Sequence, residues 1–261
     1  MKRIFLITII VVLTGVLLVS TYFIADYLLE SHEQRSIYND LSKLVEIEIE
    51  ETTKTEDSST ECTAIEESKA EIVDVSIDFA ELNSINSDSV GWIRVPDTNI
   101  NYPVVQAVGD NDYYLTHNFY GQYSVYGCPF VQENCSVDTP SDNIIIYAHN
   151  MNDGSMFAGL LNYTDFNFYE EHKHLEFITA TESNSYEIIS VFNTIAETGF
   201  RFYGFVNADS KCDFDKFVAT SKQLSFYDTG VSAEYDDELI TLATCEYSNP
   251  DSRLVVVAKK V

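Results

Sequence analysis

The sequence predicts a mainly β protein, a closed or nearly closed β-barrel with peripheral helices, carried on an N-terminal membrane anchor. From Val90 onward the chain breaks into short apolar runs of strand length, separated by turn signals, with few helical pieces between them. Its 17 tyrosines and 16 phenylalanines suit a β-rich core. Residues 4–25 contain no charged side chain, which is typical of a segment that crosses a membrane. A chain of 261 residues is long enough for one such domain plus accessory segments.

The N-terminal anchor is expected to remain uncleaved. After "MKR", the 22 residues "IFLITIIVVLTGVLLVSTYFIA" would span about 33 Å as a helix at ~1.5 Å per residue, close to the ~30 Å hydrocarbon core. Lys2 and Arg3 precede this run and acidic residues follow it, so the positive-inside rule predicts a single-pass protein of the cell membrane. Residues 1–3 would form the cytoplasmic tail, and everything after Asp26 would be extracellular. A cleaved secretory signal is the alternative, but the apolar run is long for one and contains no convincing small-x-small cleavage site.

The acidic residues concentrate just after the anchor. Residues 26–81 hold 17 Asp and Glu against 4 Lys and Arg, within a chain of net charge -27. That charge argues against a nucleic-acid partner, because a phosphate backbone requires Lys and Arg. We interpret residues 26–75 as an acidic stalk and linker, helical over 27–49 and flexible over 50–71, where Ser, Thr and Glu dominate. The folded domain is then expected at 76–261.

Strand signals dominate the remainder of the chain. "GWIRVPDTNINYPVVQ" (91–106) predicts two strands around the turn at 96–99, and "NIIIYAH" (143–149) predicts a strand buried on both faces. Helices are expected after Ser76 as N-cap, in "SIDFAELNSINSD", and in two further pieces. The other predicted strands are 174–180, 185–196, 238–245 and 253–261, and the two further helical pieces are 154–163 and 213–224.

The last two strands bring a thiol and a guanidinium together. Residues 246–252, "EYSNPDS", form a reasonable hairpin loop, so Cys245 would end one strand and Arg253 would begin its antiparallel neighbour. Residues opposite each other in such a pair share a face, with Cβ atoms ~5 Å apart. A cation beside a thiol favours the thiolate, which is the nucleophile, and a guanidinium can donate to an oxygen that becomes negative during acyl transfer. The alternative is that Cys245 is a small core residue and Arg253 is a surface charge, with no function.

His149 is the histidine best placed to assist such a thiol. It ends the buried run "NIIIYA" and precedes "NMNDGSMF", and a polar residue at the exit of a buried strand is a common position for a functional group. A satisfied structural histidine remains the alternative. The other four histidines are His32 in the stalk, His117, and His172 and His174 in a polar loop entry.

The cysteines are odd in number, so at least one thiol of this exported chain is unpaired. No CxxC pair supports a zinc site. Cys128 and Cys135 could form a small disulfide, but free structural thiols are the preferred interpretation. The five cysteines are Cys62, Cys128, Cys135, Cys212 and Cys245.

Four segments, in order, resemble the class B sortases. "TLATC" (241–245) with Arg253 is similar to the TLxTC…R signature of sortases, and "YAHNMNDGSMF" (147–157) is similar to the YGHNM…GSMF segment of that class. "DSVGWIRVPDTNINYPVVQ" (88–106) and "NDYYLTHNFYG" (111–121) resemble two earlier segments. The resemblance covers about residues 76–261.

This resemblance implies a closed eight-stranded sortase β-barrel and a cysteine transpeptidase without cofactor or metal. Such an enzyme cleaves a surface protein at a C-terminal sorting motif after Thr, holds the acyl part as a thioester, and passes it to an amine of the cell wall or to a pilin Lys. By motif position, Cys245 is the nucleophile, His149 the general acid/base, and Arg253 the residue that binds substrate and supports the oxyanion. The residues expected to line the peptide groove are Asn111, Leu115, Tyr147 and Glu246.

The sequence departs from the family pattern at three places. Ala148 stands where the family usually has Gly, and Ala243 stands at the x of TLxTC, where Ser is common. The segment "GCPFVQENC" (127–135) differs from the usual family strand by its two cysteines. No carboxylate that orients His149 is identified; Glu246 and Asp251 are only candidates.

Two other functions compete with transpeptidation. A membrane-tethered binding module with a β-barrel head would have no chemistry, but it gives no reason for the Cys, His and Arg set. A thiol peptidase that uses water as acceptor would share the first half of the reaction.

Overall fold

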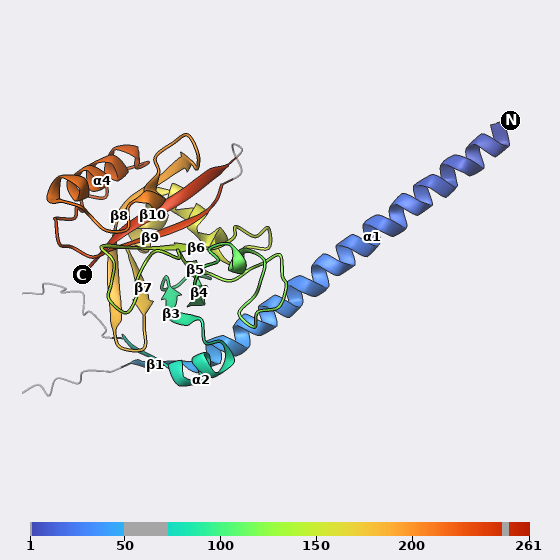
Figure 1. Ribbon diagram of the computed structural model, residues 1–261. Coiled ribbons are helices and arrows are strands. Elements are labelled where there is room, and N and C mark those ends of the chain that lie inside the picture. The colour runs from blue at the N-terminus through green and yellow to red at the C-terminus, as the bar shows by residue number, and fades with distance from the viewer. Residues whose placement is uncertain (1, 50–72, 247–250) are drawn as a thin grey trace, which may run out of the picture.

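The computed structural model describes residues 2–49, 73–246 and 251–261. The flexible linker expected at 50–71 lies outside the described residues. In the described part, one long helix leads into a β-barrel with helices at its periphery (Figure 1).

The strands close into an eight-stranded barrel, which confirms the predicted fold class. The strand order around it is β10-β8-β7-β3-β4-β5-β6-β9. The pairs β4/β5 and β6/β9 are parallel, and the other pairs are antiparallel. The bounds are β3 Ser89–Arg94, β4 Asn101–Val105, β5 Phe130–Val131, β6 Asn143–Tyr147, β7 His174–Ile178, β8 Ser183–Ile195, β9 Leu239–Cys245 and β10 Ser252–Lys260.

The barrel core forms around strands that are buried on both faces, such as β6 and β9. In β6 the first four residues are buried, and in β9 every residue before Cys245 is buried. Trp92, Phe177 and Tyr186 are among the largest fully buried side chains. Burying an aromatic or aliphatic side chain of this kind contributes ~1.5–3 kcal/mol. Packing is tight at Gly91, where a Cβ would lie 2.5 Å from two ring carbons of Phe177.

The N-terminal helix α1 (Lys2–Leu41) is continuous from the apolar segment to the barrel. Its last part packs on the domain, where Gln34, Tyr38 and Leu41 are buried. The helix expected over 27–49 is wrong at its C-terminal end, because after the short 3-10 helix η1 (Ser42–Leu44) the chain forms β1 (Val45–Ile49). This strand pairs with β2 (Val73–Ile77) in a separate two-stranded sheet. The inward positions of α1, at helical spacing, are Tyr27, Glu30, Ser31, Gln34, Ile37, Tyr38 and Leu41.

The expected N-cap Ser76 is wrong by two residues. Helix α2 (Phe79–Ile85) begins after Asp78, whose carboxylate accepts the backbone N–H of Glu81 at 2.9 Å. Ser76 lies instead within β2, where its backbone pairs with Glu46. Pairing with β1 holds this residue in extended backbone, so the next acidic residue caps the helix.

The remaining helical pieces cover the barrel or connect its strands. The piece expected at 154–163 is the 3-10 helix η3 (Phe157–Thr164), and the one expected at 213–224 is α4 (Lys211–Leu224), capped by Ser210. The others are the 3-10 helices η2 (Tyr113–Leu115) and η4 (Phe202–Gly204) and the α-helix α3 (Phe166–Glu171).

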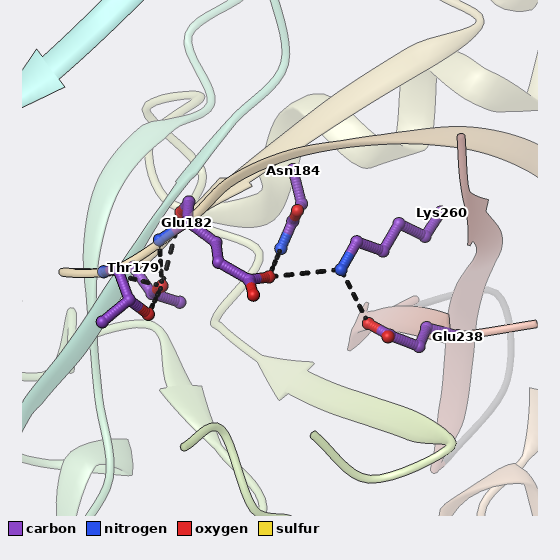
Figure 2. A network of polar contacts seen from close by, with 6 residues as sticks. Thr179, Glu182, Asn184, Glu238 and Lys260 are labelled. Atoms are coloured by element: carbon purple, nitrogen blue, oxygen red, sulfur yellow. Dashed lines mark hydrogen bonds and ion pairs between the residues drawn. The ribbon is translucent and has the colours of Figure 1, made fainter. Parts of the chain in front are cut away.

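A polar network joins three strand ends at one end of the barrel (Figure 2). Lys260, the last residue of β10, lies 3.2 Å from the carboxylate of Glu182 and 3.0 Å from that of Glu238. Glu182 precedes β8 and Glu238 precedes β9, so this network lies at the end of β9 and β10 that is opposite to Cys245 and Arg253. Ion pairs therefore connect the strands at this end of the barrel, and the candidate site lies at the other end.

Candidate active site

Cys245 and Arg253 are direct cross-strand partners. In the antiparallel pair β9/β10, Cys245 faces Arg253 in the register, and the next backbone hydrogen bond runs from Glu246 N–H to the Ser252 carbonyl at 2.9 Å. The pairing predicted from the length of the loop is therefore confirmed. Opposed residues point to the same face, so the thiol and the guanidinium share one side of the hairpin.

His149 reaches the same rim through the parallel pair β6/β9. Tyr147 is paired with Ala243. His149 lies two residues after Tyr147 and Cys245 lies two residues after Ala243, so both lie at the same end of these parallel neighbours. Hydrogen bonds fix these strand ends: Thr244 Oγ1 donates to the Ala148 carbonyl at 2.8 Å, and Asn150 Nδ2 donates to the Cys245 carbonyl at 3.0 Å. Three adjacent strands thus present the three predicted catalytic residues at one rim.

The imidazole of His149 is oriented by a backbone carbonyl. Its Nε2 lies 2.7 Å from the carbonyl oxygen of Leu115, which can only accept, so Nε2 carries a hydrogen in this arrangement. The Nδ1 atom is then the nitrogen left to exchange a proton. The carbonyl of His149 accepts the N–H of Phe157 at 2.9 Å, which fixes the backbone on the other side.

A pocket of about 180 Å³ collects the predicted residues at this rim. It contains His149, Cys245 and Arg253 together with three of the four residues expected to bind substrate. Glu246, the fourth, follows β9 directly and does not line the pocket. The lining residues are Asn111, Asp112, Leu115, Phe130, Tyr147, Ala148, His149, Ala243, Thr244, Cys245 and Arg253.

The side chains expected to contact substrate are themselves held in place. Asn111 Oδ1 accepts the backbone N–H of Glu133 at 3.0 Å, and the Tyr147 hydroxyl donates to Gln132 Oε1 at 2.6 Å. Burial raises the pKa of Tyr147 well above its usual value, so its hydroxyl stays protonated and remains a donor. The wall of the pocket is therefore largely preformed.

Sequence reasoning missed some of the pocket wall. Phe130 lies on β5, which has only two residues, too few for any periodicity to identify. Its ring lies 5.5 Å from that of Tyr147, and the two residues are paired across β5/β6. Thr244 lies inside the TLATC motif, but its hydrogen bond to Ala148 depends on a residue that lies 96 positions away and directly follows β6. Asp112 precedes η2 and also lines the pocket.

The other described cysteines are free and lie apart from this pocket. Burial raises the pKa of Cys128 to about 12 and that of Cys135 to about 11, so both thiols stay neutral at ordinary pH. Cys212 is exposed on α4. The interpretation of Cys128 and Cys135 as free structural thiols is confirmed, and Cys62 lies outside the described residues.

The sequence profile of the Sortase domain family matches residues 93–261. The chain belongs to the sortase family. Sortase B of Listeria monocytogenes is 34% identical over 186 residues, which are 70% of this chain and 74% of that protein. Sortase B of Staphylococcus aureus is 33% identical over 183 residues, which are 69% and 73% of the two chains.

Solved sortase B structures share the fold of this sortase. A crystal structure from Bacillus anthracis superposes with a TM-score of 0.71 at 31% identity, covering 90% of this chain and 99% of the other. A Staphylococcus aureus sortase B–substrate complex gives 0.65 at 31% identity, covering 70% and 84%. The resemblance to class B is thereby confirmed, and so is the assignment of the chain as a sortase B-type cysteine transpeptidase.

Proposed function

We propose that this sortase is membrane-anchored, cleaves a C-terminal sorting motif of surface proteins after Thr, and transfers the acyl part to a cell-wall amine through a thioester. The observation that carries the proposal is the register of three neighbouring strands. Cys245 is paired with Arg253 across β9/β10, and the β6/β9 register brings His149 to the same pocket. A thiol, an imidazole and a guanidinium in one small pocket suit covalent acyl transfer.

In the first half of the reaction, the Cys245 thiolate attacks the backbone carbonyl carbon of the Thr in the sorting motif. The new C–S bond forms while the carbonyl oxygen takes the negative charge. His149, protonated at Nδ1, gives that proton to the leaving amine nitrogen as the C–N bond breaks. The carbonyl of Leu115 accepts a hydrogen bond from Nε2 of His149 at 2.7 Å, so Nδ1 is the ring nitrogen that is directed away from Leu115.

In the second half, an amine attacks the thioester. Nδ1 of His149 takes a proton from the incoming nitrogen, the new C–N bond forms, and the C–S bond breaks to return the thiolate. Arg253, opposite Cys245 in the register, donates to the oxyanion in both halves. Neither half requires a cofactor.

The peptide is proposed to lie along the pocket wall formed by Asn111, Leu115 and Tyr147. Glu246 would contact it just outside the pocket, at the start of the loop between β9 and β10. Support comes from the similar Staphylococcus aureus protein, which has been solved as a sortase B–substrate complex. The specific sorting motif is a separate question for a peptide library.

The anchor is proposed to place this domain outside the cell. Helix α1 contains a segment that is long and apolar enough to cross a membrane. Lys2 and Arg3 precede that segment, so by the positive-inside rule the N-terminus stays in the cytoplasm and the barrel lies on the extracellular side. Surface proteins that are exported across the membrane would then reach the pocket on the extracellular side.

The test uses the full-length protein with sorting-motif peptides that contain Thr. Cys245→Ala should abolish cleavage, and Cys212→Ala, which changes the exposed cysteine on α4, should not. Mass spectrometry of the wild-type protein should detect a peptide acyl group on Cys245. Cleavage by Cys245→Ala would contradict the assignment.

The acceptor is decided by the product. An amide product with cell-wall amines supports the proposal, an amide with a pilin Lys supports pilin polymerisation, and a free acid alone supports hydrolysis. Binding of the peptide without cleavage by the wild-type protein would indicate a binding module instead.

A further inference from the structure

The longest uncharged run of chain after the anchor has no explanation in the proposed chemistry. Residues 113–132 contain no Asp, Glu, Lys or Arg in 20 positions, although the chain has 42 acidic and 15 basic residues. Seven of the 20 are Tyr or Phe, and acidic residues stand at both borders, at Asp112 and Glu133. The pocket uses Leu115 and Phe130 from this run, but the middle of the run does not line it.

The middle of the run is an ordered loop that exposes apolar side chains. Tyr123 is 74% exposed, and Tyr120 and Val125 are each 44% exposed. The loop is held by a bridge between His117 and Tyr123, and by Asn118 Oδ1, which accepts two backbone N–H groups at 3.0 and 3.1 Å. Three exposed apolar side chains within six residues of an uncharged loop, in a protein of net charge -27, point to an interaction surface.

This loop is tied to α1 near the end of the apolar segment. Glu30 Oε1 accepts the hydroxyl of Ser124 at 3.1 Å and the N–H of Val125 at 3.0 Å. Figure 1 shows the green loops lying beside α1 where the helix leaves the barrel. Glu30 is five residues beyond Ala25, or about 7.5 Å along a helix. The headgroup region of each leaflet is about 5–7.5 Å thick, so a span that ends at Ala25 would place Glu30 and the loop bound to it at the outer boundary of this region.

We propose that residues 120–125, called the interface loop here, contact the lipid headgroup region of the membrane that α1 crosses. This inference rests on the membrane anchoring proposed above. Tyrosine is enriched at membrane interfaces because its ring is apolar and its hydroxyl is polar. The lack of acidic side chains in the loop avoids repulsion from anionic headgroups, which the rest of this acidic surface would experience.

Such a contact would fix how the catalytic pocket faces the membrane. A single transmembrane helix can tilt in the bilayer together with the barrel that packs on it, whereas a second contact point restricts that tilt. The interface loop continues from Leu115, whose carbonyl orients His149, so the contact lies on the same segment as the pocket wall. The pocket would then keep a fixed orientation relative to the bilayer surface.

The experiment measures the contact of single tryptophans with lipid in the full-length protein. Trp92 is the only tryptophan and is fully buried, so Trp92→Phe removes its emission with little change of shape. Tyr123→Trp, Phe226→Trp and Leu13→Trp are made in that background. Phe226 is the control from another part of the surface, because it is also an exposed aromatic residue (45%, against 74% for Tyr123) and follows α4, away from α1. Vesicles of phosphatidylcholine carry bromine on the acyl chains near the headgroup, and unbrominated vesicles are the reference.

We expect bromine to quench Leu13→Trp strongly and Tyr123→Trp more than Phe226→Trp. Adding Tyr120→Asp and Val125→Asp to Tyr123→Trp should lower its quenching to the Phe226→Trp level. Equal quenching at positions 123 and 226, with Leu13→Trp still quenched, would contradict the lipid contact of the interface loop but not the membrane anchoring by α1. An unquenched Leu13→Trp overturns both. If Trp92→Phe impairs folding, Trp92 is retained, because a buried tryptophan adds only a constant background.

Discussion

Asp153 connects the loop after His149 to helix α1, and weakening it should destabilise the protein measurably. Its Oδ2 accepts the hydroxyl of Ser31 at 2.8 Å and that of Tyr126 at 3.0 Å. Its Oδ1 accepts the N–H of Ser155 at 3.1 Å and the Ser155 hydroxyl at 2.6 Å. One carboxylate thus joins α1, the loop before β5 and the loop that begins at His149.

The perturbation is Asp153→Asn, which keeps the size of the side chain but removes its charge and one acceptor oxygen. Hydrogen bonds to a charged group contribute ~1.5–3 kcal/mol and neutral ones ~0.5–1.5 kcal/mol. Asp153 is only half-buried, so screening by water reduces the difference, and we expect a loss of about 2 kcal/mol for the whole set. For a domain of this size, such a loss lowers Tm by roughly 4–8 °C.

The effect should depend on pH with a definite sign. Burial raises the pKa of Asp153, but hydrogen bonds from Ser155, Ser31 and Tyr126 outweigh it and hold the pKa below its usual value of 3.8. The ionised carboxylate therefore stabilises the folded state above that usual value, and the contribution is lost as the pH falls through the lowered pKa. The difference between wild type and Asp153→Asn should be full at neutral pH and should decline only below the usual value.

The assay is thermal unfolding of the full-length protein followed by Trp92 fluorescence, at neutral pH and in the acidic range. Asp228→Asn is the matched control, because Asp228 is an exposed loop residue whose carboxylate accepts one backbone N–H, from Gly230 at 3.0 Å. If Asp153→Asn unfolds at the wild-type temperature at neutral pH, the carboxylate does not hold these segments together. A difference that grows on acidification would contradict the direction of the pKa shift.

Three further outcomes are expected. Thr244→Val removes the buried hydroxyl that donates to the Ala148 carbonyl, so kcat for peptide cleavage should fall roughly tenfold with little change of KM, and Thr244→Ser should restore it. Iodoacetamide at mildly alkaline pH should modify Cys245 and Cys212 but leave Cys128 and Cys135 unmodified, because burial raises their pKa values to about 12 and about 11; peptide mass spectrometry reads the sites. Gly91→Ala should lower the free energy of unfolding by ~1–3 kcal/mol in chemical denaturation, because its Cβ would meet the Phe177 ring, whereas Gly204→Ala meets no atom within 4 Å and should have little effect.

The part of the site that the sequence could predict unaided is the part that one hairpin determines. Cys245 and Arg253 are separated by a short loop, so antiparallel pairing leaves few registers, and a thiol opposite a guanidinium follows from one of them. The strands around them are readable because each is buried almost throughout, as in β9. Local signals of this kind need no knowledge of distant partners.

The position of His149 beside Cys245 is a different case. It depends on the parallel pairing of β6 with β9, and no pattern within either strand encodes that pairing. Resemblance to a family supplied what spacing could not. The N-cap error at Ser76 has the same origin, because the strand that holds this residue extended is β1, which precedes it by about thirty residues.

The docking of α1 also lay beyond sequence reasoning, and the reason is chemical. Its inward face carries Glu30, Ser31 and Gln34 among the apolar residues, so no clean apolar stripe marks it as a packed surface. Two of these polar residues are explained by their partners, since Glu30 binds Ser124 and Val125 and Ser31 binds Asp153. Those partners lie more than 90 residues away, so a stalk and a packed helix look alike in the sequence.

Two small residues give the pocket its shape at the strand ends. Ala243 is paired with Tyr147, and the Ala148 carbonyl accepts the Thr244 hydroxyl, so both alanines lie at the strand ends that carry the predicted catalytic residues. Both are buried and both line the pocket of about 180 Å³. A side chain with more atoms at either position would take volume directly beside Cys245 or His149. The methyl group of Ala243 also offers no hydroxyl to a substrate, so the preference for the sorting motif should differ from that of sortases with Ser at this position.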